Sequence, residues 1–252
     1  EFIVEESINA LKNGKTHYLS AKGLKILREK ISKEYYDSKI CSNEVIIIPG
    51  LKTGLYFLLN SLNLKNVCLL EPYWLGYRHT INLSSLNYTS VNMYESNWID
   101  KLKDLNFDAL IMCNPNNPDG KMFTKYEIEK ILNIASEKEA HLISDEIYHY
   151  FSYDQKHVSL KNYISNYDKL YIMNGFSKSF AFSGMRIGFI ASKNKKILSY
   201  IEKLQQNITT CTNSLAQYAL INFNKSLDVV KERVKYYKSN RKLVSEMNSN
   251  FK

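Results

Sequence analysis

Residues 170–191 read LYIMNGFSKSFAFSGMRIGFIA. The apolar runs at the two ends of this stretch, 170–173 and 187–191, are too short for helices and are bounded by turn residues, which is typical of β-strands. The loop between them carries two cationic side chains, Lys178 and Arg186. In open α/β sheets, ligands collect outside the carboxyl ends of the strands, so polar residues that directly follow a strand are candidates for a site.

The same alternation continues on both sides of this stretch. Further candidate strands are residues 45–48, 67–70, 88–91, 109–113 and 141–144, and the segments 23–36, 52–62, 124–138 and 193–207 have helical patterns. Strands that alternate with helices predict an α/β fold, a three-layer α/β/α arrangement around a mostly parallel sheet of about seven strands. From residue 213 to about 247 the pattern predicts one long helix, without Gly or Pro and without a further strand.

Composition limits the class of protein. The chain has 252 residues, 44% of them hydrophobic, and no apolar stretch approaches the roughly 20 residues that cross a bilayer, so no membrane association is expected. The net charge of +9 comes from 29 Lys against 5 Arg, scattered beside acidic residues, and this pattern favours a solvated surface over a nucleic-acid site. Cys41, Cys68, Cys113 and Cys211 lack the spacing of a metal site, which predicts reduced thiols, no metal and a cytoplasmic protein.

Three residues at strand ends each allow a structural and a chemical interpretation. Gly50 is either a simple turn or the start of a phosphate site at a helix N-terminus. Lys178 is either one solvated lysine among many or a desolvated amine that attacks a carbonyl. Asp145 is either a helix N-cap or a carboxylate reserved for a cationic ligand atom. Taken singly, residues 114–120 are a Pro/Asn/Gly turn and Trp74 is a core aromatic.

Six short blocks, taken in order, point to one family. They are YLSAKGL (18–24), PGLKTGL (49–55), PYW (72–74), NPNNPDG (114–120), DEIY (145–148) and NGFSKSFAFSGMRIG (174–188). In this order they resemble the class I/II aminotransferases of the fold-type I family, which use pyridoxal phosphate. The resemblance spans nearly the whole chain. It implies an enzyme that transfers an amino group between an amino acid and a 2-oxo acid.

The resemblance assigns roles by position. Lys178 matches the catalytic lysine that holds pyridoxal phosphate as an internal aldimine and moves the proton at the substrate Cα, and Asp145 matches the partner of the pyridine nitrogen. The other implied cofactor contacts are Tyr148 and Asn117 to the phenolic oxygen, Trp74 stacked on the ring, and the phosphate ligands Leu51, Lys52 and Arg186. Asn117 would also touch the substrate carboxylate. Tyr18 matches a tyrosine that reaches the phosphate of the neighbouring subunit, which implies a homodimer.

The chain departs from the family pattern in two respects. Gly175 stands where family members often have a hydroxyl residue that helps to hold the phosphate, so Ser177 or Asn174 is expected to replace that contact. The family also has an N-terminal arm and a small C-terminal domain. We therefore expect residues 1–212 to be the cofactor-binding large domain without that arm, and 213–252 to be a long helix leading to a small domain that is absent. In the family, the small domain supplies an arginine that binds the substrate α-carboxylate, and no motif in this chain replaces it. The other arginines of the chain lie in helical segments: Arg28, Arg78, Arg233 and Arg241.

Two alternatives to transamination stay open at this point. A β-lyase or decarboxylase uses the same fold and cofactor, because fold alone does not choose the bond that breaks. A non-catalytic aminotransferase-like module or fragment is the other. The amino donor is not specified either: Tyr73, Trp74 and Tyr77 could form an aromatic wall, but simple packing is the favoured interpretation of these rings.

Overall fold

Seven strands form a single sheet in the computed structural model, which describes residues 2–249. The strand order is β1-β7-β6-β5-β4-β2-β3. The strands are β1 (Val45–Ile48), β2 (Asn66–Glu71), β3 (Asn87–Asn92), β4 (Ala109–Cys113), β5 (His141–Asp145), β6 (Leu170–Gly175) and β7 (Gly188–Ala191). All neighbouring pairs are parallel except those that β7 makes with β1 and β6. The expected mostly parallel, seven-stranded sheet is confirmed.

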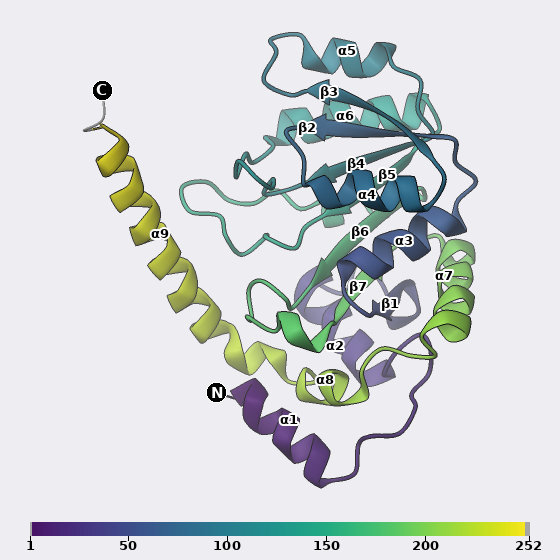
Figure 1. Cartoon of the computed structure of the whole chain (residues 1–252), viewed down its shortest axis with the longest axis vertical. Coiled ribbons are helices and arrows are strands. Elements are labelled where there is room, and N and C mark those ends of the chain that lie inside the picture. The colour runs from purple at the N-terminus through teal and green to yellow at the C-terminus, as the bar shows by residue number, and fades with distance from the viewer. Residues whose placement is uncertain (1, 250–252) are drawn as a thin grey trace.

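Helices cover both faces of this sheet (Figure 1). They are α1 (Phe2–Lys12), α2 (Lys25–Tyr36), α3 (Leu51–Ser61), α4 (Leu75–Leu83), α5 (Trp98–Asp104), α6 (Lys125–Glu137), α7 (Lys195–Ile208), α8 (Ser214–Ala219) and α9 (Leu227–Ser249). Short 3₁₀ turns lie at Ser42–Glu44, Leu160–Asn162, Ser183–Met185 and Phe223–Ser226. The start of α6 follows from its sequence, because Thr124 and Glu127 form a reciprocal capping box there.

Each face of the sheet has its own apolar core, as the alternation of side chains along a strand requires. Ile46 and Ile48 of β1 pack with α3, α4 and α7, whereas Val45 and Ile47 pack toward α2, α5, α6 and α8. All four residues of β1 are buried, so the strand reads as a continuous apolar run. These two cores make the three-layer architecture that the sequence predicts.

The single long helix expected over 213–247 is wrong. The tract is divided into α8, a 3₁₀ turn and α9, with Asn222 leaving helical geometry at φ −113° and ψ 36°. The break places the ring of Phe223 in the core, 5.2 Å from Phe176 and 5.4 Å from Tyr35, measured between ring centroids. Burial of this aromatic outweighs the helical preference of the local sequence. As expected, no strand follows residue 212 within the described part of the chain.

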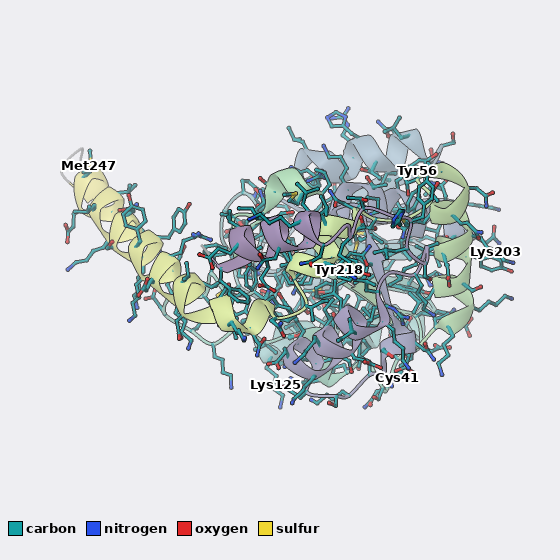
Figure 2. The ribbon with its side chains drawn as sticks, turned by 90° about the horizontal axis from the view of Figure 1, so that it is seen from below. Cys41, Tyr56, Lys125, Lys203, Tyr218 and Met247 are labelled. Carbon is teal, nitrogen blue, oxygen red and sulfur yellow. The ribbon has the colours of Figure 1, made fainter. Side chains whose placement is uncertain are left out.

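Helix α9 runs away from the body of the molecule (Figure 1), and Figure 2 shows the same projection toward the labelled Met247. Large apolar side chains along its outer half are exposed, including Leu243, Val244 and Met247. Among residues 2–249, neither α9 nor any other helix has an apolar stretch of the length needed to span a membrane.

Candidate active site

The site lies where parallel strands of the sheet end. Cys113 of β4 pairs with Asp145 of β5, and Asp145 pairs with Met173 of β6, so the segments that follow these strands start beside one another. A cavity of about 210 Å³ opens there. It is lined by every predicted site residue except Tyr18: Leu51, Lys52, Trp74, Asn117, Asp145, Tyr148, Lys178 and Arg186. The strand-end rule therefore brings together residues from five separate segments of the chain.

Asp145 is buried at the base of the cavity. Its Oδ1 accepts a hydrogen bond of 3.1 Å from the backbone N–H of Ile147, and its Oδ2 accepts one of 2.8 Å from the hydroxyl of Tyr77. Burial raises the pKa of this carboxyl to about 6, although the two hydrogen bonds and Lys178 oppose the rise. No α-helix begins at Asp145, so the N-cap interpretation does not apply. A buried carboxylate that lines a cavity favours a cationic partner.

Polar groups gather beside Lys178. Its Nζ lies 5.6 Å from the centre of the Tyr148 ring, and the Nδ2 of Asn117 donates a 3.3 Å hydrogen bond to the Tyr148 hydroxyl. On another wall, the Nζ of Lys52 lies 5.2 Å from the centre of the Trp74 ring. The cavity thus combines an amine, a phenol, an amide and an indole within reach of one bound molecule.

Gly50 and Arg186 form an anion-binding cradle. Gly50 precedes α3 with φ +84°, a conformation that side chains rarely adopt, and the helix starts at Leu51 and Lys52. A Cβ at Gly50 would lie 2.5 Å from the Nη2 of Arg186, so the guanidinium occupies the space that a side chain would need. A helix N-terminus and an arginine that face the same space fit a phosphate.

The structure explains why Gly175 carries no hydroxyl side chain. A Cβ there would lie 2.9 Å from the Cα of Gly188, where β6 pairs with β7. Of the two expected replacements, Asn174 is engaged elsewhere: its Oδ1 accepts from the N–H of Gly175, and its Nδ2 lies 3.0 Å from the Nδ1 of His149. Ser177 lines the cavity instead. Of these two residues, Ser177 is therefore the one positioned to contact a molecule bound there.

A larger cavity of about 1100 Å³ adjoins the first and shares its walls at Asn117, Tyr148 and Lys178. Helix α9 contributes Tyr237 and Arg241 to its lining. The motifs did not indicate this position for Arg241, which is ion-paired with Asp154. Tyr18 is 84% exposed and lines neither cavity, so within one chain it does not reach the site.

Tyr77 is the residue that sequence reasoning missed. Packing was the favoured interpretation of its ring, yet its hydroxyl is the side-chain donor to Asp145. Its position three residues after Trp74, in the first turn of the helix that follows Trp74, is the one signal that could have placed it near the site. Across residues 2–249, no group of three or more His, Cys, Asp or Glu side chains is arranged to hold a metal ion.

Residues 1–249 match the family described as aminotransferase class I and II. The chain belongs to the class I and II aminotransferase family. Among curated aminotransferases, the aspartate aminotransferase of Sulfurisphaera tokodaii is 33% identical over 97% of this chain and 64% of its own length. The (5-formylfuran-3-yl)methyl phosphate transaminase of Methanocaldococcus jannaschii is 34% identical over 96% of this chain and 66% of its own length. The chain therefore spans about two thirds of the length of these relatives.

Solved aminotransferase structures share the fold. A mutant aspartate aminotransferase of Thermus thermophilus superposes with a TM-score of 0.92 at 25% identity, covering 99% of this chain and 69% of that one. The aromatic aminotransferase of Pyrococcus horikoshii gives a TM-score of 0.89 at 30% identity, covering 97% of this chain and 70% of that one. The three-layer fold around the strand-end cavity is thus the fold of this aminotransferase family.

Proposed function

We propose that the chain is the cofactor-binding part of a pyridoxal-phosphate-dependent aminotransferase that moves an amino group between an amino acid and a 2-oxo acid. The observation that carries the proposal is the cavity where Lys178, the buried Asp145 and the cradle of Gly50 and Arg186 face one another. Membership of the aminotransferase family supports the same conclusion. The printed names of the relatives include aspartate and aromatic-amino-acid aminotransferases, which supports amino acids as the substrate class.

The residues present fit the cofactor. Pyridoxal phosphate carries a phosphate, a ring nitrogen that binds a proton, a phenolic oxygen and an aldehyde; when bound, it supplies an electron sink for the carbanion formed at the substrate Cα. The cradle suits the phosphate, and the carboxylate suits the protonated nitrogen. A lysine amine is the nucleophile that combines with an aldehyde.

Each residue then has a defined task. Lys178 would hold the cofactor covalently and afterwards move the proton at the substrate Cα. Asp145 would keep the proton on the ring nitrogen, and Trp74 would pack against the ring and exclude water. The remaining contacts are hydrogen bonds from Tyr148 and Asn117 to the phenolic oxygen, and phosphate contacts from Arg186, Ser177 and the N–H groups of Leu51 and Lys52. The adjoining cavity has room for the amino acid.

The proposal extends to assembly. Residues 1–212 would form the large domain and 213–252 would lead toward a small domain, which is supported by the exposed apolar side chains along α9. Two chains would pair so that Tyr18 reaches the neighbouring phosphate, because its exposed side chain lies outside the cavity of its own chain. The free cysteines, Cys41, Cys68, Cys113 and Cys211, are compatible with a reducing cytoplasm.

Covalent trapping tests the role of Lys178. The protein is loaded with pyridoxal phosphate, reduced with borohydride and digested, and the modified peptide is located by mass spectrometry. We expect the adduct on Lys178 and its loss in Lys178→Ala. The matched control is Lys52→Ala, which removes the other lysine of the cavity and should leave the adduct in place. An unchanged adduct yield in Lys178→Ala would contradict the assignment.

A second measurement identifies the reaction. The loaded protein is mixed with a series of amino acids, and the products are separated. Release of the matching 2-oxo acid, with the amino group retained until 2-oxoglutarate is added, is expected for an aminotransferase. Release of pyruvate with ammonia, or of carbon dioxide, would instead indicate a lyase or a decarboxylase.

A further inference from the structure

Tyr77 touches two groups of the site at once. It lies in the first turn of α4, is 3% exposed, and donates a 2.8 Å hydrogen bond to the Oδ2 of Asp145. Its ring meets the Trp74 ring edge to face, with centroids 5.3 Å apart and planes at 87°. One side chain therefore joins the carboxylate at the base of the cavity to the indole in its wall.

We propose that Tyr77 is a positioning residue for the cofactor site: its hydroxyl keeps the Asp145 carboxylate ionised and oriented, and its ring supports Trp74. The inference rests on the function proposed above. It assigns to the two halves of one side chain, the hydroxyl and the ring, separate effects that can be measured separately.

Orientation follows from where the two carboxylate oxygens are held. The Oδ1 accepts from the N–H of Ile147 and the Oδ2 accepts from Tyr77, so the plane of the carboxylate is fixed from two sides. Burial, and secondarily the Asp145 carboxylate, raise the pKa of Tyr77 well above its ordinary value, so the hydroxyl retains the proton that it donates. Tyr77 therefore acts as a permanent donor.

The charge state of Asp145 is set by opposing neighbours. Burial is the largest influence and raises its pKa to about 6, and Glu146 adds to the rise, whereas Tyr77, the N–H of Ile147 and Lys178 favour the ionised form. Tyr148 and Cys113 also face the carboxylate; the pKa of each is raised, first by burial and further by Asp145. Without the Tyr77 hydroxyl, a larger fraction of Asp145 would be protonated at a pH where the site needs its carboxylate ionised.

The first test measures Asp145 directly, in protein without cofactor. The ¹³C carboxyl resonance of Asp145, assigned by its loss in Asp145→Asn, is followed against pH. Because a lost hydrogen bond to a charged group is worth roughly one pKa unit or more, Tyr77→Phe should move the midpoint upward by about one pH unit. Incorporation of 3-fluorotyrosine at position 77 strengthens the donor and should move the midpoint downward, which tests the hydroxyl in a second variant of nearly unchanged shape.

Tyr73→Phe is the matched control. Tyr73 directly precedes Trp74, just before α4 begins, and its hydroxyl is paired with Tyr88 and not with Asp145. The midpoint of Asp145 should stay unchanged in this variant. An unchanged midpoint in both Tyr77→Phe and the fluorotyrosine protein would overturn the role of the hydroxyl.

The ring is tested separately. Tyr77→Leu removes both the hydroxyl and the aromatic edge, whereas Tyr77→Phe keeps the edge, so only the leucine variant should change the fluorescence of the Trp74 indole. Trp98, the second tryptophan, is replaced by Phe in all proteins of this comparison so that Trp74 alone is observed. Equal Trp74 spectra in Tyr77→Leu and Tyr77→Phe would overturn the supporting role of the ring.

Cofactor affinity separates this inference from the proposed function. In Tyr77→Phe, the affinity for pyridoxal phosphate should begin to fall at a pH about one unit higher than in the wild type as the solution is acidified, because Asp145 is protonated earlier. If Asp145→Asn binds the cofactor as tightly as the wild type, the proposed role of Asp145 fails, whatever Tyr77 does. If Asp145→Asn binds weakly while Tyr77→Phe follows the wild-type pH profile, Tyr77 alone is misassigned.

Discussion

The surroundings of position 175 leave no room for a side chain, which explains the glycine found there. A Cβ at Gly175 would lie 2.9 Å from the backbone of Gly188 and 3.1 Å from Leu51. Gly175→Ser, which restores the residue type common in the family, should therefore destabilise the fold by about 1–3 kcal/mol, the usual cost of overpacking a buried site. Urea unfolding followed by circular dichroism measures this loss.

Gly184→Ser is the control for this prediction. Nothing lies within 4 Å of a Cβ at that position, so the same substitution should change the free energy of unfolding by no more than about 0.5 kcal/mol. A neutral effect of Gly175→Ser would mean that β6 and β7 have room for the hydroxyl and that close packing is not the reason for glycine here.

Single residues were predictable where chemistry and strand ends coincide. Asp145 and Lys178 could be singled out because Asp145 ends one apolar strand and Lys178 lies in the loop after another, and parallel strands bring their ends together. Tyr77 could not, because its partner is 68 residues away in the sequence and the rotation of α4 against the sheet has no sequence signal. The fit at Gly175 depends in the same way on a contact across β6 and β7.

Helices and strands could be predicted from the sequence where short-range patterns determine them. Short runs of Ile, Val and Leu predict the strands of the sheet, and Thr124 followed three residues later by Glu127 is the residue pattern of a capping box at a helix start. The break between α8 and α9 was not predictable, because it depends on the burial of Phe223 among aromatic rings from distant segments. A local pattern without Gly or Pro still predicts an unbroken helix there.

The cap of α6 supports a prediction at the scale of one element. The Thr124 side chain accepts from the N–H of Glu127, and the Glu127 carboxylate accepts from the N–H of Thr124. Thr124→Ala should cost about 1 kcal/mol in the free energy of unfolding, measured in urea. Ser136→Ala, exposed in the last turn of the same helix, should be neutral or slightly stabilising. Equal effects of the two substitutions would show that the cap adds nothing.

At the scale of the whole molecule, the sheet class was predictable but the strand order was not. Alternating strands and helices indicate a parallel sheet, yet β7 lies antiparallel between β1 and β6. The pairing of Val45 with Ala191 joins residues far apart in the chain, and no periodicity specifies it. This placement of β7 brings Arg186, just before the strand, next to Gly50, just after β1.

Assembly gives the last prediction, since Tyr18 is exposed and lies outside the cavity of its own chain. Tyr18→Phe and Lys178→Ala subunits, carrying different tags, are co-expressed and the mixed dimer is isolated. In the mixed dimer, the Tyr18→Phe subunit keeps Lys178 and receives an intact Tyr18 from its partner. Half of the sites should therefore bind pyridoxal phosphate as tightly as the wild type, whereas a Tyr18→Phe homodimer binds more weakly because a phosphate hydrogen bond is missing. A mixed dimer no tighter than the Tyr18→Phe homodimer would place Tyr18 outside the neighbouring site.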